Sequence, residues 1–96
     1  MRVISKKPLR EFWELHPESR PMLEGWFRKV CRTEAWSFPA LQQTFRSADY
    51  VDGFTIFDVG GNRYRIAAVI HYDKQRLYVK EVMTHADYDR NAWRKR

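Results

Sequence analysis

Three stretches rich in aromatic and β-branched residues, joined by two short turn segments, constrain the fold of this chain more than any other feature. They cover residues 54–59, 64–72 and 76–83. Such side chains favour strands, and the segments Gly60-Gly61-Asn62 and Asp73-Lys74-Gln75 are short and turn-forming. The pattern therefore predicts three consecutive antiparallel strands.

The residues before these strands have a helical pattern. Apolar and aromatic residues recur at three- and four-residue spacing in residues 9–16 and again in residues 22–30. Residues 3–5 predict a short strand, and Thr84 can cap a last helix. Residues 39–45 form either a short helix or an ordered connection, and the pattern does not distinguish the two. The expected fold is α+β, with two N-terminal helices on one face of a small antiparallel sheet and a short C-terminal helix.

Length and composition fit a single domain, residues 1–96. The chain has 44% hydrophobic residues, enough apolar surface for one core, and no linker or repeat divides it. The longest apolar run, residues 66–70, is far shorter than the roughly 20 residues of a membrane helix, and the N-terminus lacks an apolar signal segment. These features predict a cytoplasmic protein with no membrane partner.

Positive charge exceeds negative charge, as is typical of proteins that bind polyanions. Eighteen Lys and Arg residues against twelve Asp and Glu give a formal charge of +6. Four of the positive charges lie in a basic tail, residues 90–96, and subtracting 4 from +6 leaves only +2 for the body of the domain. The arrangement of the charges on the fold therefore matters more than their sum.

Alternation along the second and third strands sorts their side chains into two faces. The predicted core side holds Tyr64, Ile66, Ala68, Ile70, Leu77, Val79 and Met83, with Glu81 as an exception. The predicted basic face holds Arg63, Arg65, His71, Arg76, Tyr78 and Lys80, together with Ala67, Val69 and Val82, and no carboxylate from these strands. A hairpin loop of even length would place His71 opposite Arg76 and Ala67 opposite Lys80.

The basic face has two interpretations. It can be an ordinary solvated face, on which basic residues also prevent edge pairing. Alternatively, it binds a phosphate-rich ligand, because clustered cations repel one another without an anion, and Tyr78 can stack on a base. The strand pattern leaves both interpretations open.

Several other chemistries lack the residues that they require. The single cysteine, Cys31, excludes a thiolate zinc cluster, and the three histidines are scattered over different elements. The chain has no GxxxxGK loop for nucleotide hydrolysis. We therefore expect neither a metal site nor a cofactor.

Five segments, spread in order over nearly the whole chain, carry a family resemblance. They are MRVIS, FWELHP, SADYV, GGNRYRIAAVIHY and VMTHADYD. Together they resemble the HigB family of bacterial toxins. The resemblance implies the RelE-like fold, ribosome-dependent cleavage of translated mRNA, and neutralisation by a HigA-type helix-turn-helix antitoxin. Contact with DNA would then be indirect, through the antitoxin.

The resemblance covers six residues without assigning their roles, namely Asn62, Tyr64 and Arg65 in the GGNRYR turn and strand, Lys80 on the last strand, and His85 and Tyr88 in THADYD. Cleavage by attack of a 2′-hydroxyl on the adjacent phosphate needs a base, an acid and cations. For a metal-independent endoribonuclease we assign Arg65 to the phosphate charge, Lys80 as candidate base and His85 as acid. The residues expected to contact RNA are Arg63, Tyr64, His71, Arg76, Tyr78 and Tyr88.

These assignments have alternatives. Arg65 can pair with Asp58 across the hairpin, His85 can cap the last helix, and Tyr88 can pack on the sheet. The same basic face would also serve a non-catalytic RNA- or ribosome-binding module, or a corepressor that acts with its antitoxin at their promoter. Only turnover distinguishes the enzyme from the binding module.

Overall fold

The computed structural model describes residues 1–90 and has the predicted α+β fold. The elements follow one another as β1 (Arg2–Ile4), α1 (Lys7–Leu15), η1 (Pro17–Ser19), α2 (Arg20–Cys31), α3 (Phe38–Thr44), β2 (Asp49–Val51), β3 (Phe54–Val59), β4 (Tyr64–His71), η2 (Tyr72–Lys74), β5 (Arg76–Thr84) and α4 (His85–Asp89). The basic tail, apart from Arg90, lies outside the described residues. The helix left open for residues 39–45 is present as α3.

The described residues form a five-stranded sheet with the strand order β1-β5-β4-β3-β2. Strands β2 to β5 are antiparallel neighbours in chain order. Strand β1 pairs in parallel with β5, so the sheet is mixed, which the expectation of an antiparallel sheet did not include. The sequence pattern also did not indicate β2, because a strand of three residues is too short to show alternation.

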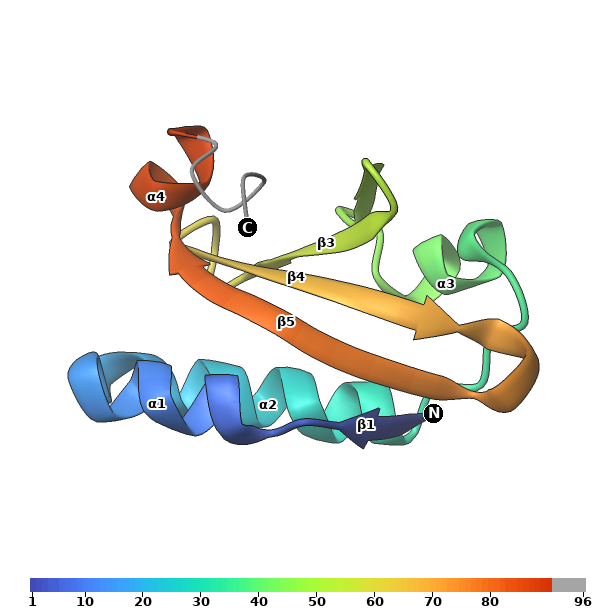
Figure 1. Ribbon diagram of the computed structural model, residues 1–96, viewed down its shortest axis with the longest axis horizontal. Coiled ribbons are helices and arrows are strands. Elements are labelled where there is room, and N and C mark those ends of the chain that lie inside the picture. The colour runs from blue at the N-terminus through green and yellow to red at the C-terminus, as the bar shows by residue number, and fades with distance from the viewer. Residues whose placement is uncertain (91–96) are drawn as a thin grey trace.

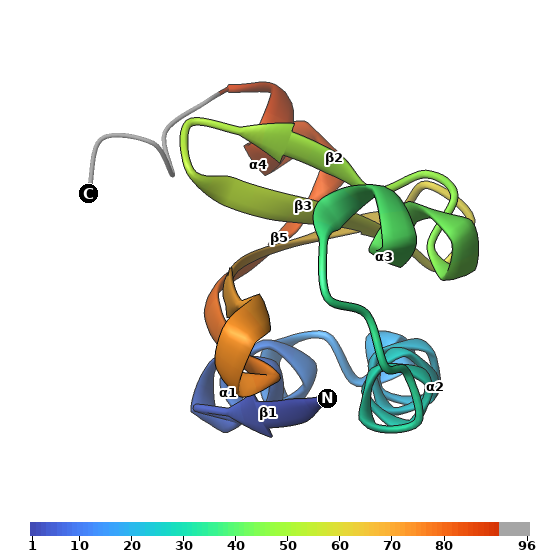
Figure 2. The ribbon, with the colours of Figure 1, turned by 90° about the vertical axis from the view of Figure 1, so that its right-hand side faces the viewer.

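Helices α1 and α2 lie side by side on one face of the sheet, as Figures 1 and 2 show. Each has a proline in its first turn, where the missing N–H has no intrahelical partner to lose. The main core combines helix and sheet residues, including Leu9, Phe12, Leu23, Trp26, Val30, Phe57, Ile66, Leu77 and Val79. The predicted packing of both helices on one face is therefore confirmed, and we call the opposite face of the sheet the outer face.

The pairing of β4 with β5 contains a bulge. Next to the hairpin loop His71 lies opposite Arg76, as predicted. Ala67, however, lies opposite Glu81 and not opposite Lys80, because the register shifts directly after Ala67. Lys80 is thus an extra residue in β5, and an extra residue reverses the alternation of the residues that follow it.

The bulge corrects the predicted faces of the second half of β5. Val82, expected on the basic face, packs against the main core. Met83, expected in the core set, joins a second apolar cluster with Ile56 and Ala67 on the outer face. Glu81, paired with Ala67, belongs to the outer face as well. The prediction that this face lacks carboxylates from β4 and β5 was therefore wrong.

Within residues 1–90, no helix combines the length and the apolar composition needed to cross a membrane.

Candidate functional site

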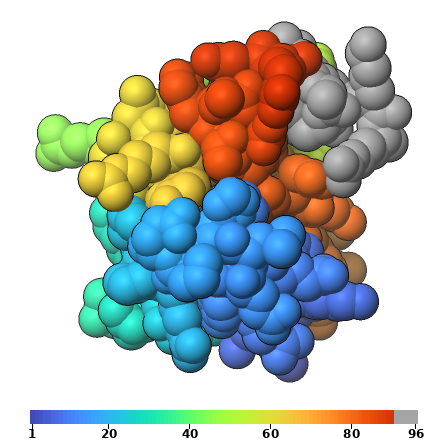
Figure 3. Space-filling model, turned by 90° about the vertical axis from the view of Figure 1, so that its left-hand side faces the viewer, coloured from blue at the N-terminus to red at the C-terminus, as the bar shows by residue number. Residues whose placement is uncertain are grey.

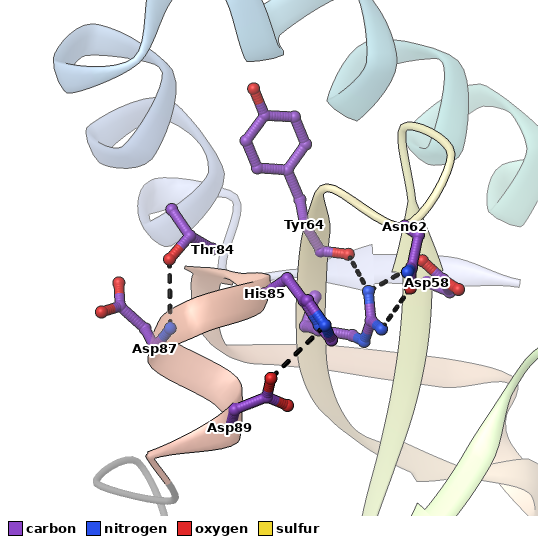
Figure 4. A network of polar contacts seen from close by, with 8 residues as sticks. Asp58, Asn62, Tyr64, Thr84, His85, Asp87 and Asp89 are labelled. Carbon is purple, nitrogen blue, oxygen red and sulfur yellow. Dashed lines mark hydrogen bonds and ion pairs between the residues drawn. The ribbon is translucent and has the colours of Figure 1, made fainter.

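Arg65, near the start of β4, is held by three oxygen acceptors. Its Nη1 donates hydrogen bonds to Asp58 Oδ1 at 2.8 Å and to the carbonyl oxygen of Tyr64 at 3.1 Å, and its Nη2 donates to Asn62 Oδ1 at 2.5 Å (Figure 4). Only 11% of the side chain is exposed. The pairing with Asp58 that the sequence left open is present, because the β3–β4 register places the two residues opposite each other.

The turn between β3 and β4 positions Asn62. Gly60, Gly61 and Asn62 all have left-handed backbone conformations, with φ values of 70°, 60° and 78°. Glycine adopts this region without strain, and asparagine tolerates it better than most residues do. A Cβ atom at Gly60 would lie 2.5 Å from Met22 Sδ and 3.0 Å from Tyr64 Cδ2. The tight packing of this glycine fixes the turn, and the turn directs the Asn62 amide toward Arg65.

Helix α4 brings His85 and Tyr88 to the same end of the molecule. Figure 3 shows this helix, in red, beside the yellow β3–β4 turn. The side chain of Thr84 accepts a hydrogen bond from the backbone N–H of Asp87 at 3.1 Å, so Thr84 caps the helix as predicted and His85 does not. The Tyr88 ring packs on the outer-face cluster, and its centroid lies 5.6 Å from Cζ of Arg65. Tyr88 therefore covers one side of the guanidinium.

His85 is an imidazole that lies next to a carboxylate. Its Nε2 lies 3.4 Å from Asp89 Oδ2, and 45% of its side chain is exposed. Its Nδ1 is buried and has no hydrogen-bond partner among residues 1–90. The backbone N–H of His85 donates to the carbonyl of Arg63 at 2.9 Å, which ties α4 to the β3–β4 turn. An imidazole that lies beside a carboxylate and is partly open to solvent has the geometry of a proton donor or acceptor.

Carboxylates accompany the cations at this end of the sheet. Asp58 bonds to Arg65 and Asp89 lies beside His85. A hydrogen bond from the Arg90 guanidinium lowers the pKa of Asp87 below its usual value. The Asp87 carboxylate, in the first turn of α4, therefore stays ionised at neutral pH. Its negative charge interacts favourably with the positive end of the helix dipole.

Lys80, Tyr78 and His71 form a second group farther along the outer face. Lys80 Nζ lies 5.7 Å from the centroid of the Tyr78 ring, and the His71 ring centroid lies 5.1 Å from the same ring. On β5, Lys80 precedes the residue opposite Arg65 by three positions, which is about 10 Å of strand. The structure therefore groups Lys80 with Tyr78, and it places Arg65 beside Tyr88 of α4, the helix that begins at His85.

The remaining residues that were predicted to contact RNA differ in their exposure to solvent. Arg63 and Arg76 are exposed, as a phosphate contact requires. Tyr64 is only 6% exposed, and its ring packs edge-on against Phe12 with a centroid distance of 5.6 Å. In Figure 4 this ring points away from Asn62 and His85. Its burial does not agree with an RNA contact, and only its carbonyl oxygen takes part in the site.

Asp89 is a site residue that the sequence analysis missed. Its signal was present, because side chains four positions apart on a helix lie on the same face, and Asp89 follows His85 by four. Within residues 1–90, no three His, Cys, Asp or Glu side chains gather in an arrangement that could hold a metal ion. Metal independence of the reaction stays a prediction.

Comparison with known proteins gives the same family as the sequence motifs. The profile of HigB_toxin, described as the RelE-like toxic component of a toxin-antitoxin system, matches residues 19–91. The mRNA interferase toxin HigB of Escherichia coli K12 is 32% identical over 92 residues, which cover 93% of this chain and 88% of the relative. The mRNA interferase HigB of Escherichia coli O6:H1 is 30% identical over 93 residues, covering 94% and 90%. Since the profile matches most of the chain and both proteins are matched over most of their length, the chain belongs to the HigB family of RelE-like toxins.

Proposed function

We propose that this protein is a ribosome-dependent mRNA interferase, a toxin that stops translation by cutting mRNA while it is translated. The observation that carries the proposal is the group formed by Arg65, His85 and Tyr88, which joins a guanidinium, an imidazole and a phenol at one end of the outer face. The two relatives named as mRNA interferases support the same activity. Such a toxin acts in the cytoplasm, and a HigA-type helix-turn-helix antitoxin neutralises it.

The proposed reaction begins with attack of a 2′-hydroxyl on the adjacent phosphorus. A 2′,3′-cyclic phosphate forms, the bond to the 5′ oxygen breaks, and that oxygen takes up a proton. Arg65 stabilises the negative charge that develops on the phosphate. His85 donates the proton to the leaving oxygen, and Lys80 stays the candidate for the base that accepts the proton of the 2′-hydroxyl.

The second group supplies contacts to the RNA on one side of the cut. Tyr78 offers a ring for a base, while Lys80, Arg76 and His71 offer positive or hydrogen-bonding groups for phosphates. Because Lys80 lies in this second group, it also fits a phosphate contact with a neighbouring nucleotide. Rate and affinity measurements on Lys80→Ala distinguish a base, whose loss slows cleavage, from a contact, whose loss weakens binding.

Growth arrest with translation-dependent mRNA cleavage is the expected result of inducing this protein without an antitoxin. Messages should be cut while they are translated and should stay intact when initiation is blocked. Co-expression of a HigA-type helix-turn-helix antitoxin should restore growth. If the folded protein arrests growth but leaves translated messages intact, the non-catalytic ribosome-binding alternative is correct.

Replacement of His85 by alanine should slow single-turnover cleavage by about a hundredfold, because proton transfer to the leaving oxygen is lost. His71→Ala is a matched control, since His71 is an exposed histidine on the same sheet face at the far end of β4. It should weaken binding a few-fold and leave the saturated rate unchanged. Programmed ribosomes at saturating toxin give the rate, and equal rate losses in the two variants would contradict the role of His85.

A further inference from the structure

The guanidinium of Arg65 is fixed in its plane and direction. A guanidinium carries five N–H groups, and three hydrogen bonds are formed with Asp58, Asn62 and the Tyr64 carbonyl. Five minus three leaves two N–H groups, one on Nε and one on Nη2. These nitrogens are neighbours, so together they can donate to two oxygens of one phosphate.

The acceptors come from separate parts of the fold. Asp58 belongs to β3, Asn62 belongs to the β3–β4 turn, and the Tyr88 ring that covers the guanidinium comes from α4. A cross-strand ion pair alone would bind the guanidinium at one nitrogen and leave it free to turn about that contact. The second acceptor, on the other terminal nitrogen, removes this freedom.

We infer that Asp58 and Asn62 are positioning residues of the cleavage reaction. Together with the Tyr64 carbonyl they form a guanidinium slot, which holds Arg65 with its two remaining N–H groups directed at the phosphate that is cut. This inference rests on the proposed function, because the slot has a catalytic meaning only if the protein cleaves RNA. A misplacement of about 1 Å can cost a hundredfold in rate, so the acceptors matter although neither touches the substrate.

Asn62→Gly tests the slot with little disturbance of the backbone. Glycine adopts the left-handed conformation of residue 62 freely, so the turn is kept while the amide acceptor is lost. The expected result is a fall in kcat of about tenfold on programmed ribosomes, with KM unchanged, because Arg65 stays paired with Asp58 but loses its second anchor. An unchanged kcat in the folded variant would overturn the role of Asn62.

Chemical rescue tests whether the slot recognises a guanidinium as such. Arg65→Ala removes the guanidinium and keeps its acceptors, so added guanidinium ion at non-denaturing concentration should raise the cleavage rate by about tenfold. Sodium chloride at equal ionic strength should not do so. The rescue should be lost in the double variants Arg65→Ala/Asp58→Asn and Arg65→Ala/Asn62→Gly. If Asp58 and Asn62 only stabilised the fold, the folded double variants would be rescued as well as Arg65→Ala is.

A matched control is the exposed ion pair on α2, in which Arg20 Nε lies 3.3 Å from Glu24 Oε1. Glu24→Gln removes a carboxylate from an arginine far from the slot and should leave both the rate and the rescue unchanged. Rescue that persists without the slot acceptors, or that is absent from the folded Arg65→Ala protein, would overturn the inference. Wild-type protein that does not cleave RNA on programmed ribosomes would instead overturn the proposed function, so the two failures are distinguishable.

Discussion

Arg65→Ala is expected to lower the single-turnover rate of mRNA cleavage on programmed ribosomes by about a hundredfold or more. The guanidinium is the cation that the fold holds most firmly at the candidate site, and its two remaining N–H groups act on charge that develops only in the transition state. Affinity for the programmed ribosome should change much less than the rate.

Arg63→Ala is the control for the loss of Arg65, because it removes an exposed arginine two positions away. It should weaken binding modestly and reduce the salt dependence of binding by about one phosphate contact, with the saturated rate retained. Thermal unfolding checks that both variants are folded, since Arg65→Ala also leaves Asp58 without its partner. A wild-type cleavage rate in folded Arg65→Ala would show that Arg65 takes no part in the reaction.

Phe57→Ala is expected to lower the free energy of unfolding by about 3–5 kcal/mol, because truncating a buried phenylalanine leaves a cavity. The side chain is 1% exposed and meets Trp26 and Phe45 edge-on, with centroid distances of 5.2 and 5.1 Å. The total stability of small domains is only about 5–15 kcal/mol, so the variant should be largely unfolded near physiological temperature if the wild type lies at the lower end.

Urea denaturation followed by circular dichroism measures the effect of Phe57→Ala. Leu15→Ala is the matched apolar control, because Leu15 is 80% exposed on α1 and its loss should change the unfolding free energy by no more than about 0.5 kcal/mol. Similar destabilisation in both variants would contradict the position of the main core between the helices and the sheet.

The sequence predicted those parts of the site that depend on local rules. Alternation placed Arg65 and His71 on the same sheet face, and the cap at Thr84 marked the start of α4. The hairpin made the pairing of Arg65 with Asp58 foreseeable as an alternative. These features follow from periods and spacings within one or two neighbouring elements, so a single sequence is enough to predict them.

Features that depend on how separate elements meet were not predictable in this way. The family resemblance included Asn62, but nothing in the sequence showed that its amide reaches Arg65, because that contact depends on a left-handed turn packed against Met22 of α2. The positions of Glu81 and Met83 on the outer face depend on the bulge in β5. A bulge arises from the pairing of two strands and leaves no period in either one.

The bulge at Lys80 has a consequence for which residues of β5 can vary. Counted without Lys80, the strand alternates without interruption, with Val79 and Val82 on the core side and Tyr78, Glu81 and Met83 on the outer side. The core therefore places no demand on residue 80, and a chain lacking it would keep every other β5 side chain on its present face. Loss of Glu81 would have the same effect, whereas loss of Tyr78, Val79 or Val82 would move neighbouring side chains to the opposite face. The bulge at residues 80 and 81 is thus a place in β5 where a residue can be lost or exchanged for the sake of a ligand without repacking the core.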